Sequence, residues 1–413
     1  SWLAPRRERP RPDTCQAFRT DGQRLTRSNA NVQFGYRQGA PEEIVCPSCL
    51  LPFPTRQLLF LPGVSQVGQQ AKPQVGKIGF FDKMRNQPPK PPKDEFGRQY
   101  SRRICPLPDC GRELPVTAGS QPNLIIGLVG AKFSGKTHYI TSLIHRLGEI
   151  AVDFDASLVH QGDATQDRYE DMREQLFDLR EELAVTTGAP PPLVYDLQIG
   201  GSLWNTPLDR SATLALYDTA GENLDSASEA ERMVQYLRVA SGLIFLIDPL
   251  QIQRVRDRIP NPPKIAGGDI GFTDPQVIIG NVLDLLEKNG ALNAGERLQL
   301  PVAVVLAKSD ALRDQGLMPE TRIWNSKRGH RLALDQTLIN DVSGMFGEFL
   351  QRYAPDAYAT IVQRFPNHAF FGVSATGCAP DEDGFPFIAP WRVEDPLLWL
   401  MGQLQLIPIR EEL

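Results

Sequence analysis

Short apolar runs and stretches of helical periodicity alternate along the chain from about residue 124 to its end. The runs show little apolar–polar alternation, which is typical of strands buried on both faces of a parallel sheet. The expected strands are 124–129, 193–199, 213–217, 243–247, 302–306 and 369–373. The expected helices include 136–147, 276–288, 338–353 and 396–405. This order predicts an α/β domain over 119–413, with helices on both faces of a mostly parallel sheet in three layers.

A further stripe of apolar residues at helical spacing lies in the unusually long segment after the first expected helix. Its members are Tyr169, Met172, Leu176, Leu179 and Leu183. Spacing of three and four residues places side chains on one helical face. We therefore expect a helix whose apolar face packs on the core, rather than a ligand-binding element.

The first 118 residues differ from the rest in composition and charge. They carry an excess of Lys and Arg, whereas the remainder is acidic and gives the whole chain its net charge of −5. Residues 1–40 contain few apolar clusters and predict an extended basic arm. Residues 41–118 contain paired cysteines and predict a separate small module.

The cysteine pairs are Cys46 with Cys49 and Cys105 with Cys110. Two such knuckles resemble a zinc ribbon, in which four thiolates close a tetrahedral structural Zn²⁺ site. The long spacer between the pairs predicts an inserted loop over "QLLFLPG…PPKPPK". Reduced surface thiols, or a redox pair or disulfide, remain the alternatives.

The bulk properties set the expected location. Six cysteines in 413 residues do not form a disulfide scaffold, which favours a reducing compartment. No apolar stretch is long enough to span a membrane, and no signal-peptide pattern opens the chain. We expect a cytoplasmic protein, and abundant Arg, Pro and Ala suit a GC-rich bacterial genome. The initial Ser is compatible with a truncated or processed start.

The stretch "GAKFSGKT" at 130–137 matches G-x-x-x-x-G-K-[ST] between an expected strand and an expected helix. Backbone N–H groups of such a loop surround phosphate oxygens at the helix N-terminus. Lys136 would bind the β- and γ-phosphates, and Thr137 would hold Mg²⁺. The residues expected to contact the nucleotide here are Gly130, Ser134, Gly135, Lys136 and Thr137. A kinase, an ATPase and a GTPase all remain open at this point.

Three later motifs narrow the choice of nucleotide. In "DTAG", Asp218 would hold Mg²⁺ and the Gly221 N–H would contact the γ-phosphate. In "AKSD", the carboxylate of Asp310 would accept hydrogen bonds from guanine, while Lys308 would pack across the purine. Adenine has no such donor pair, which disfavours an ATPase or kinase. In "SAT", backbone N–H groups at Ser374 and Ala375 would meet guanine O6.

This motif order resembles the P-loop GTPases of the translation-factor-related class, and the layout is similar to bacterial double-GTPase-type proteins. The resemblance implies a switch I threonine, which we place at Thr187 with Thr186 as the alternative. Two departures matter. Ala307 replaces an Asn or Thr that ties the base-reading loop to the phosphate loop, and Glu222 replaces a water-orienting Gln.

These observations predict a Mg²⁺-dependent, GTP-binding regulatory switch that hydrolyses GTP slowly without a partner. The alternative function is a non-hydrolysing adaptor whose zinc ribbon docks a protein or nucleic acid, in a bacterial conflict or defence system. The partners are guanine nucleotide and an unidentified protein effector or activator. Nucleic acid has less support, because the ribbon lacks interleaved aromatic and Arg residues.

Overall fold

The computed structural model describes most of the chain beyond the expected arm. The described residues are 41–63, 72–79, 87–94, 96–184, 190–200, 210–218, 227–260, 273–290, 292–318, 323–324 and 330–411. At 210, 218 and 227–232 only the backbone is described.

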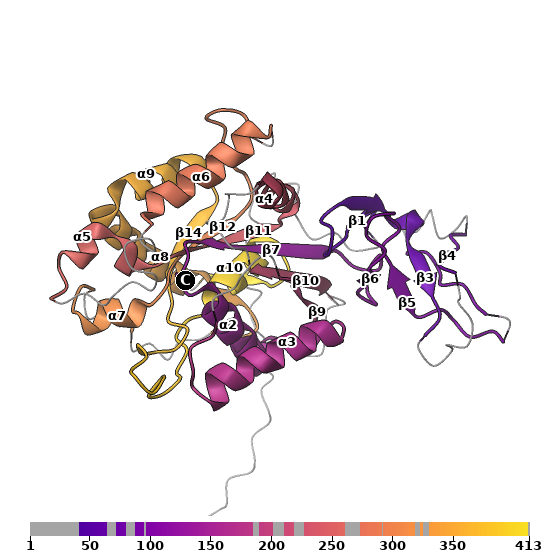
Figure 1. Cartoon of the computed structure of the whole chain (residues 1–413), viewed down its shortest axis with the longest axis horizontal. Coiled ribbons are helices and arrows are strands. Elements are labelled where there is room, and N and C mark those ends of the chain that lie inside the picture. Colours follow the sequence, from indigo (N-terminus) through magenta and orange to yellow (C-terminus); the bar gives the residue numbers. More distant parts are fainter. Residues whose placement is uncertain are drawn as a thin grey trace, which may run out of the picture.

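A mostly parallel sheet forms the centre of the larger part of the molecule (Figure 1). Within the described residues it has seven strands in the order β14-β12-β11-β7-β10-β9-β8. Neighbouring strands from β14 to β10 run parallel, whereas β9 is antiparallel to both β10 and β8. Their bounds are β7 Asn123–Gly130, β8 Ala156–His160, β9 Leu193–Ile199, β10 Arg210–Asp218, β11 Gly242–Ile247, β12 Val302–Leu306 and β14 His368–Gly372. The predicted α/β class and mostly parallel sheet are confirmed.

Helices cover both faces of this sheet, which gives the predicted three layers (Figure 1). α2, α3 and α10 lie on one face, and α4, α6 and α9 lie on the other. The bounds of the α-helices are α2 Lys136–Ile150, α3 Asp163–Arg173, α4 Ala227–Val239, α5 Gln253–Arg256, α6 Pro275–Lys288, α7 Ser309–Asp314, α8 Gln336–Tyr353, α9 Pro355–Arg364 and α10 Asp395–Gln403. The shorter turns are η3 Ala151–Phe154, the π-helical η4 Glu174–Asp178 and η5 Pro249–Gln251, and a small sheet pairs β13 Leu334–Asp335 with β15 Ile409–Arg410.

Close packing against the central strand depends on one glycine. A Cβ on Gly127 of β7 would lie only 1.7 Å from the Tyr236 hydroxyl oxygen of α4. Any side chain there would therefore collide with the buried Tyr236 ring. The glycine lets the aromatic ring lie directly on the strand that leads to the phosphate loop.

The apolar stripe after α2 is only partly the core-facing helix that its spacing predicts. α3 contains Tyr169 and Met172, but the chain widens into η4 and leaves helical structure after Asp178. A π turn adds one residue to the helical repeat and rotates the following side chains. Leu176 is buried, whereas Leu179 is 58% exposed, so the expectation for Leu179 is wrong. Leu183 is buried beyond the helix, beside Phe385.

The cysteine-bearing module lies at one end of the α/β domain (Figure 1). It consists of the hairpin β1 Glu43–Val45 and β2 Pro52–Pro54, the turn η1 Thr55–Gln57 and a sheet in the order β4-β3-β5-β6. The strands of that sheet are β3 Leu59–Leu61, β4 Gln74–Val75, β5 Arg102–Ile104 and β6 Glu113–Leu114. β3 comes from the segment expected as an inserted loop, yet it pairs with β5 directly beside Cys105.

The first cysteine knuckle contacts the α/β domain through backbone and side chain. Asn123 Nδ2 at the start of β7 donates to the Val45 carbonyl at 2.8 Å, and the Tyr217 hydroxyl donates to the Pro47 carbonyl. Leu50, which directly follows Cys49, belongs to the hydrophobic core of the larger domain. The knuckle is therefore packed on the strands β7 and β10.

Candidate nucleotide-binding site

The loop between β7 and α2 has the compact backbone that its motif requires. Phe133 and Gly135 both adopt left-handed conformations, with φ of 62° and 87°. A Cβ on Gly130 would lie 2.5 Å from the Leu246 carbonyl oxygen, so β11 leaves no room for a side chain. The loop then enters α2 at Lys136, where the N-terminal end of the helix dipole favours an anion.

The lysine of the motif lies across this loop. Lys136 Nζ donates to the carbonyls of Gly130 and Ala131 at 2.9 and 2.6 Å, and its side chain is buried. Among the described residues, Ser134 Oγ is buried without a hydrogen-bond partner. Thr137 occupies the first turn of α2. A buried ammonium group and an unsatisfied hydroxyl in one glycine-containing loop fit a phosphate-bearing ligand.

The base-reading motif after β12 is held against the phosphate loop. Lys308 Nζ donates to the Phe133 carbonyl at 3.2 Å and forms an ion pair with Asp248 Oδ2 at 2.7 Å. Lys308 has a φ of 49°, and the following α7 places Asp310 in its buried first turn. The structure thus brings Lys308 to the loop that would bind phosphate.

The third loop, after β14, is held by the same helix that starts at the phosphate loop. Ser142 Oγ of α2 donates to the Ala375 carbonyl at 2.7 Å. Ser374 Oγ accepts from the Gly377 N–H at 2.8 Å, and its backbone exchanges hydrogen bonds with Trp391. Trp391 stacks on Trp324 with ring centroids 4.5 Å apart. The loop therefore has a fixed position beside α2.

Some predicted site residues cannot be placed by this structure. Thr186, Thr187, Gly221 and Glu222 lie outside the described residues. Asp218 is the last residue of β10, paired in register with Leu128 of β7, and only its backbone is described.

His138, which directly follows Thr137 in α2, is only partly exposed. Its Nε2 accepts the Leu183 N–H at 3.2 Å, and its ring lies edge-on to Phe385. Burial, with a further contribution from the positive charge of Lys308, lowers the pKa of His138 to about 4. The neutral ring consequently anchors the segment that precedes residues 185–189.

Two buried residues outside the sequence motifs lie behind the phosphate loop. Asp248 follows β11 and pairs with Lys308, and Gln251 Nε2 donates to the Lys132 carbonyl at 3.0 Å. Both are buried. The only sequence signal for them is a polar residue at the end of an apolar run, in "LIFLIDPLQ".

The four predicted zinc ligands meet in the small module. The Sγ atoms of Cys46, Cys49, Cys105 and Cys110 all lie within 4.8 Å of one another, and Cys46 Sγ is 3.8 Å from Cys110 Sγ. The Ser48 N–H points at Cys46 Sγ at 3.4 Å. Four convergent thiols with such backbone support suit a tetrahedral metal site.

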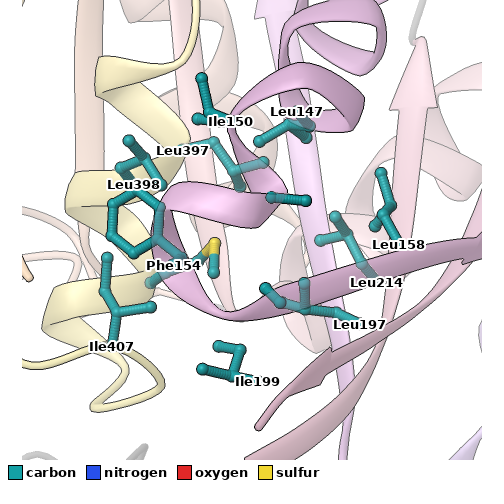
Figure 2. Close-up of a pocket in the computed structure, with 13 residues that line it drawn as sticks. Leu147, Ile150, Phe154, Leu158, Leu197, Ile199, Leu214, Leu397, Leu398 and Ile407 are labelled. Carbon is teal, nitrogen blue, oxygen red and sulfur yellow. The ribbon is translucent and has the colours of Figure 1, made fainter. Parts of the chain in front are cut away.

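A separate apolar cavity lies at the opposite end of α2 (Figure 2). It has a volume of about 30 Å³ and is lined by apolar residues of α2, η3, α10 and the β8–β10 edge, such as Leu147, Phe154 and Leu397. A cavity without polar groups cannot orient a nucleotide. It is therefore no alternative to the candidate nucleotide-binding site around Lys136.

The fold and these loops define a P-loop nucleotide-binding protein of the GTPase type. The chain belongs to the Double-GTPase 2 family, whose family model matches residues 124–335. The match includes the phosphate loop and the Lys308–Asp310 motif.

Individual proteins to which the chain is similar share less than a third of its residues over the matched parts. "Putative ESX-1 scaffolding and assembly protein SaeC" of Mycolicibacterium smegmatis is 27% identical over 238 residues, or 54% of this chain and 56% of the relative. The chain thus spans about half the length of that relative. Elongation factor SelB of Methanococcus maripaludis, with the GTP analogue GppNHp, is 12% identical over 62% of this chain and 30% of that chain, with a TM-score of 0.22. The S. cerevisiae Ski7 GTPase-like domain bound to GTP is 14% identical over 69% of this chain and 50% of that chain, with a TM-score of 0.28.

No helix among the described residues combines the length and the apolar character needed to cross a membrane.

Proposed function

We propose that the protein binds GTP and GDP with Mg²⁺ and hydrolyses GTP slowly, as a regulatory switch. The joining of three loops at one edge of the sheet carries this proposal. Lys308 donates to the phosphate loop at Phe133, and Ser142 of α2 holds the loop of Ala375. Open α/β sheets bind ligands at this carboxyl edge of their strands.

Each loop would contact a different part of the nucleotide. Lys136 would exchange its two carbonyl acceptors for phosphate oxygens, because a charged acceptor makes the stronger hydrogen bond. Thr137 and Asp218 would hold Mg²⁺, which neutralises phosphate charge when bound. Asp310 would accept hydrogen bonds from guanine, and the N–H groups at Ser374 and Ala375 would donate to its O6.

The switch itself remains a prediction from the sequence. Thr187 and Gly221 would gain contacts only when the third phosphate is present, and would order the segments 184–192 and 219–235. Glu222 is a poor substitute for a water-orienting amide, so hydrolysis without a partner would be slow. The anchoring of Leu183 by His138 supports a fixed start for the first segment.

An adaptor that binds GTP without hydrolysing it is the second candidate. The scaffolding and assembly role in the name of the mycobacterial relative favours a protein partner. Ala307 and Glu222, which depart from the GTPase motifs, favour binding without hydrolysis. In both candidates Cys46, Cys49, Cys105 and Cys110 would bind one Zn²⁺ with a purely structural role.

Nucleotide titration tests the proposal. Fluorescent mant-GDP should bind in the presence of Mg²⁺ more tightly than mant-ATP, and Lys136→Ala should abolish binding. Lys132→Ala is the matched control, because it removes a lysine side chain from the same loop but leaves Lys136 in place. Equal affinity for both nucleotides would contradict guanine selectivity. GTP binding with no phosphate release, with or without cell extract, would favour the adaptor.

A further inference from the structure

The phosphate loop receives a hydrogen bond from a buried side chain that belongs to none of the nucleotide-binding motifs. Gln251 is 1% exposed and lies at the end of η5, the turn that follows β11. Its Nε2 donates to the carbonyl of Lys132 at 3.0 Å. β11 lies between the strand of the phosphate loop and the strand of the base-reading motif, so η5 can reach both.

Asp248 sets the direction of this turn. Its Oδ1 accepts the Leu250 N–H at 2.9 Å, and its backbone carbonyl accepts the Gln251 N–H at 2.9 Å. Its Oδ2 pairs with Lys308, whose Nζ also donates to the Phe133 carbonyl. Two consecutive carbonyls of the phosphate loop, those of Lys132 and Phe133, thus receive donors from two adjacent strand ends.

These donors matter because of the shape a phosphate loop must have. A loop that turns its N–H groups toward an anion directs carbonyls elsewhere, and a buried carbonyl without a donor is costly. Phe133 is also held at a φ of 62°, which persists in a non-glycine residue only when its surroundings fix it. Ala307 has only a methyl group, so position 307 can supply no side-chain donor.

We propose that Gln251 is the positioning residue that holds the phosphate loop in its nucleotide-binding shape. It acts through the Lys132 carbonyl, without touching the nucleotide. The inference rests on the proposed function, since it concerns the affinity of that same site. In this proposal Gln251, which follows β11, donates the hydrogen bond to the phosphate loop that Ala307 cannot donate.

The test compares two isosteric variants in the 413-residue chain. Gln251→Met keeps the size of the side chain and removes its donor. It also removes Gln251 Oε1, which is buried without a partner among the described residues, so thermal stability should change little. Gln121→Met is the matched control, because Gln121 is a buried glutamine at the other end of the sheet and bonds Asp196.

The readouts are the dissociation rate of mant-GDP and hydrogen exchange of the peptide 130–137 without nucleotide. Gln251→Met should release mant-GDP about tenfold faster, the effect of one lost hydrogen bond, and should increase exchange in that peptide. Gln121→Met should change neither. Unchanged release and exchange in Gln251→Met would overturn the inference while wild-type binding still supports the proposed function. Failure of the wild-type protein to bind mant-GDP would instead overturn the proposed function.

Discussion

Docking of the cysteine-bearing module on the α/β domain can be tested at Leu50. This side chain is 2% exposed and belongs to the core of the larger domain, although it directly follows a predicted zinc ligand. Its φ of 60° lies in the left-handed region, which disfavours a non-glycine residue by roughly 1–2 kcal/mol. Burial of the side chain must offset that backbone energy.

Leu50→Ala should therefore destabilise the α/β domain measurably. Removing a buried leucine side chain beyond Cβ costs about 2–5 kcal/mol, depending on how far the site can relax. Leu51→Ala is the matched control, because Leu51 is 43% exposed and should cost less than about 0.5 kcal/mol.

Urea unfolding followed by tryptophan fluorescence measures the stability of the α/β domain in both variants. Apart from Trp2, every tryptophan of the chain lies beyond residue 118, outside the cysteine-bearing module. A lower midpoint for Leu50→Ala than for Leu51→Ala would show that the knuckle stabilises the α/β domain. Two equal midpoints would refute the docking.

Three further predictions concern the sites themselves. Asp310→Asn should weaken GDP binding and improve XDP binding in competition titrations, and an unchanged preference would contradict the guanine-reading role. Metal analysis should find about one zinc per chain, and Cys46→Ser should lose it; a folded wild-type protein without metal would contradict the site. Wild-type GTP turnover should be at or below roughly 10⁻⁴ to 10⁻³ s⁻¹. Glu222→Gln should accelerate single-turnover phosphate release. An equal rate in the two proteins would leave Glu222 without a catalytic role.

The central strands could be predicted because burial on both faces demands an uninterrupted apolar run. All five residues of β12 are buried, and the run "VAVVL" shows no alternation. β8, Ala156–His160, was missed because it is an edge strand with mostly exposed side chains. Its sequence carries neither a continuous apolar run nor a strict alternation.

The candidate motif residues could be selected from the sequence, because phosphate and base recognition require fixed spacings along the chain. The cysteine cluster could be predicted equally well, because the two cysteines of each pair lie close in sequence. Gln251 and Asp248 could not be found in this way, because their partners at Lys132 and Lys308 are distant in sequence. Only the strand order brings the exit of β11 beside both loops.

The hydrogen bond from Ser142 to Ala375 means that α2 fixes the distance between the phosphate loop and the loop after β14. Ser142 lies six residues beyond Lys136, or about 9 Å along the helix axis. The two ends of a nucleotide would thus meet loops whose separation is set by one rigid element. Guanosine alone and pyrophosphate alone would each gain only part of the contact energy. The covalent link between them raises the effective concentration of the second fragment, so the intact nucleotide should bind far better than either.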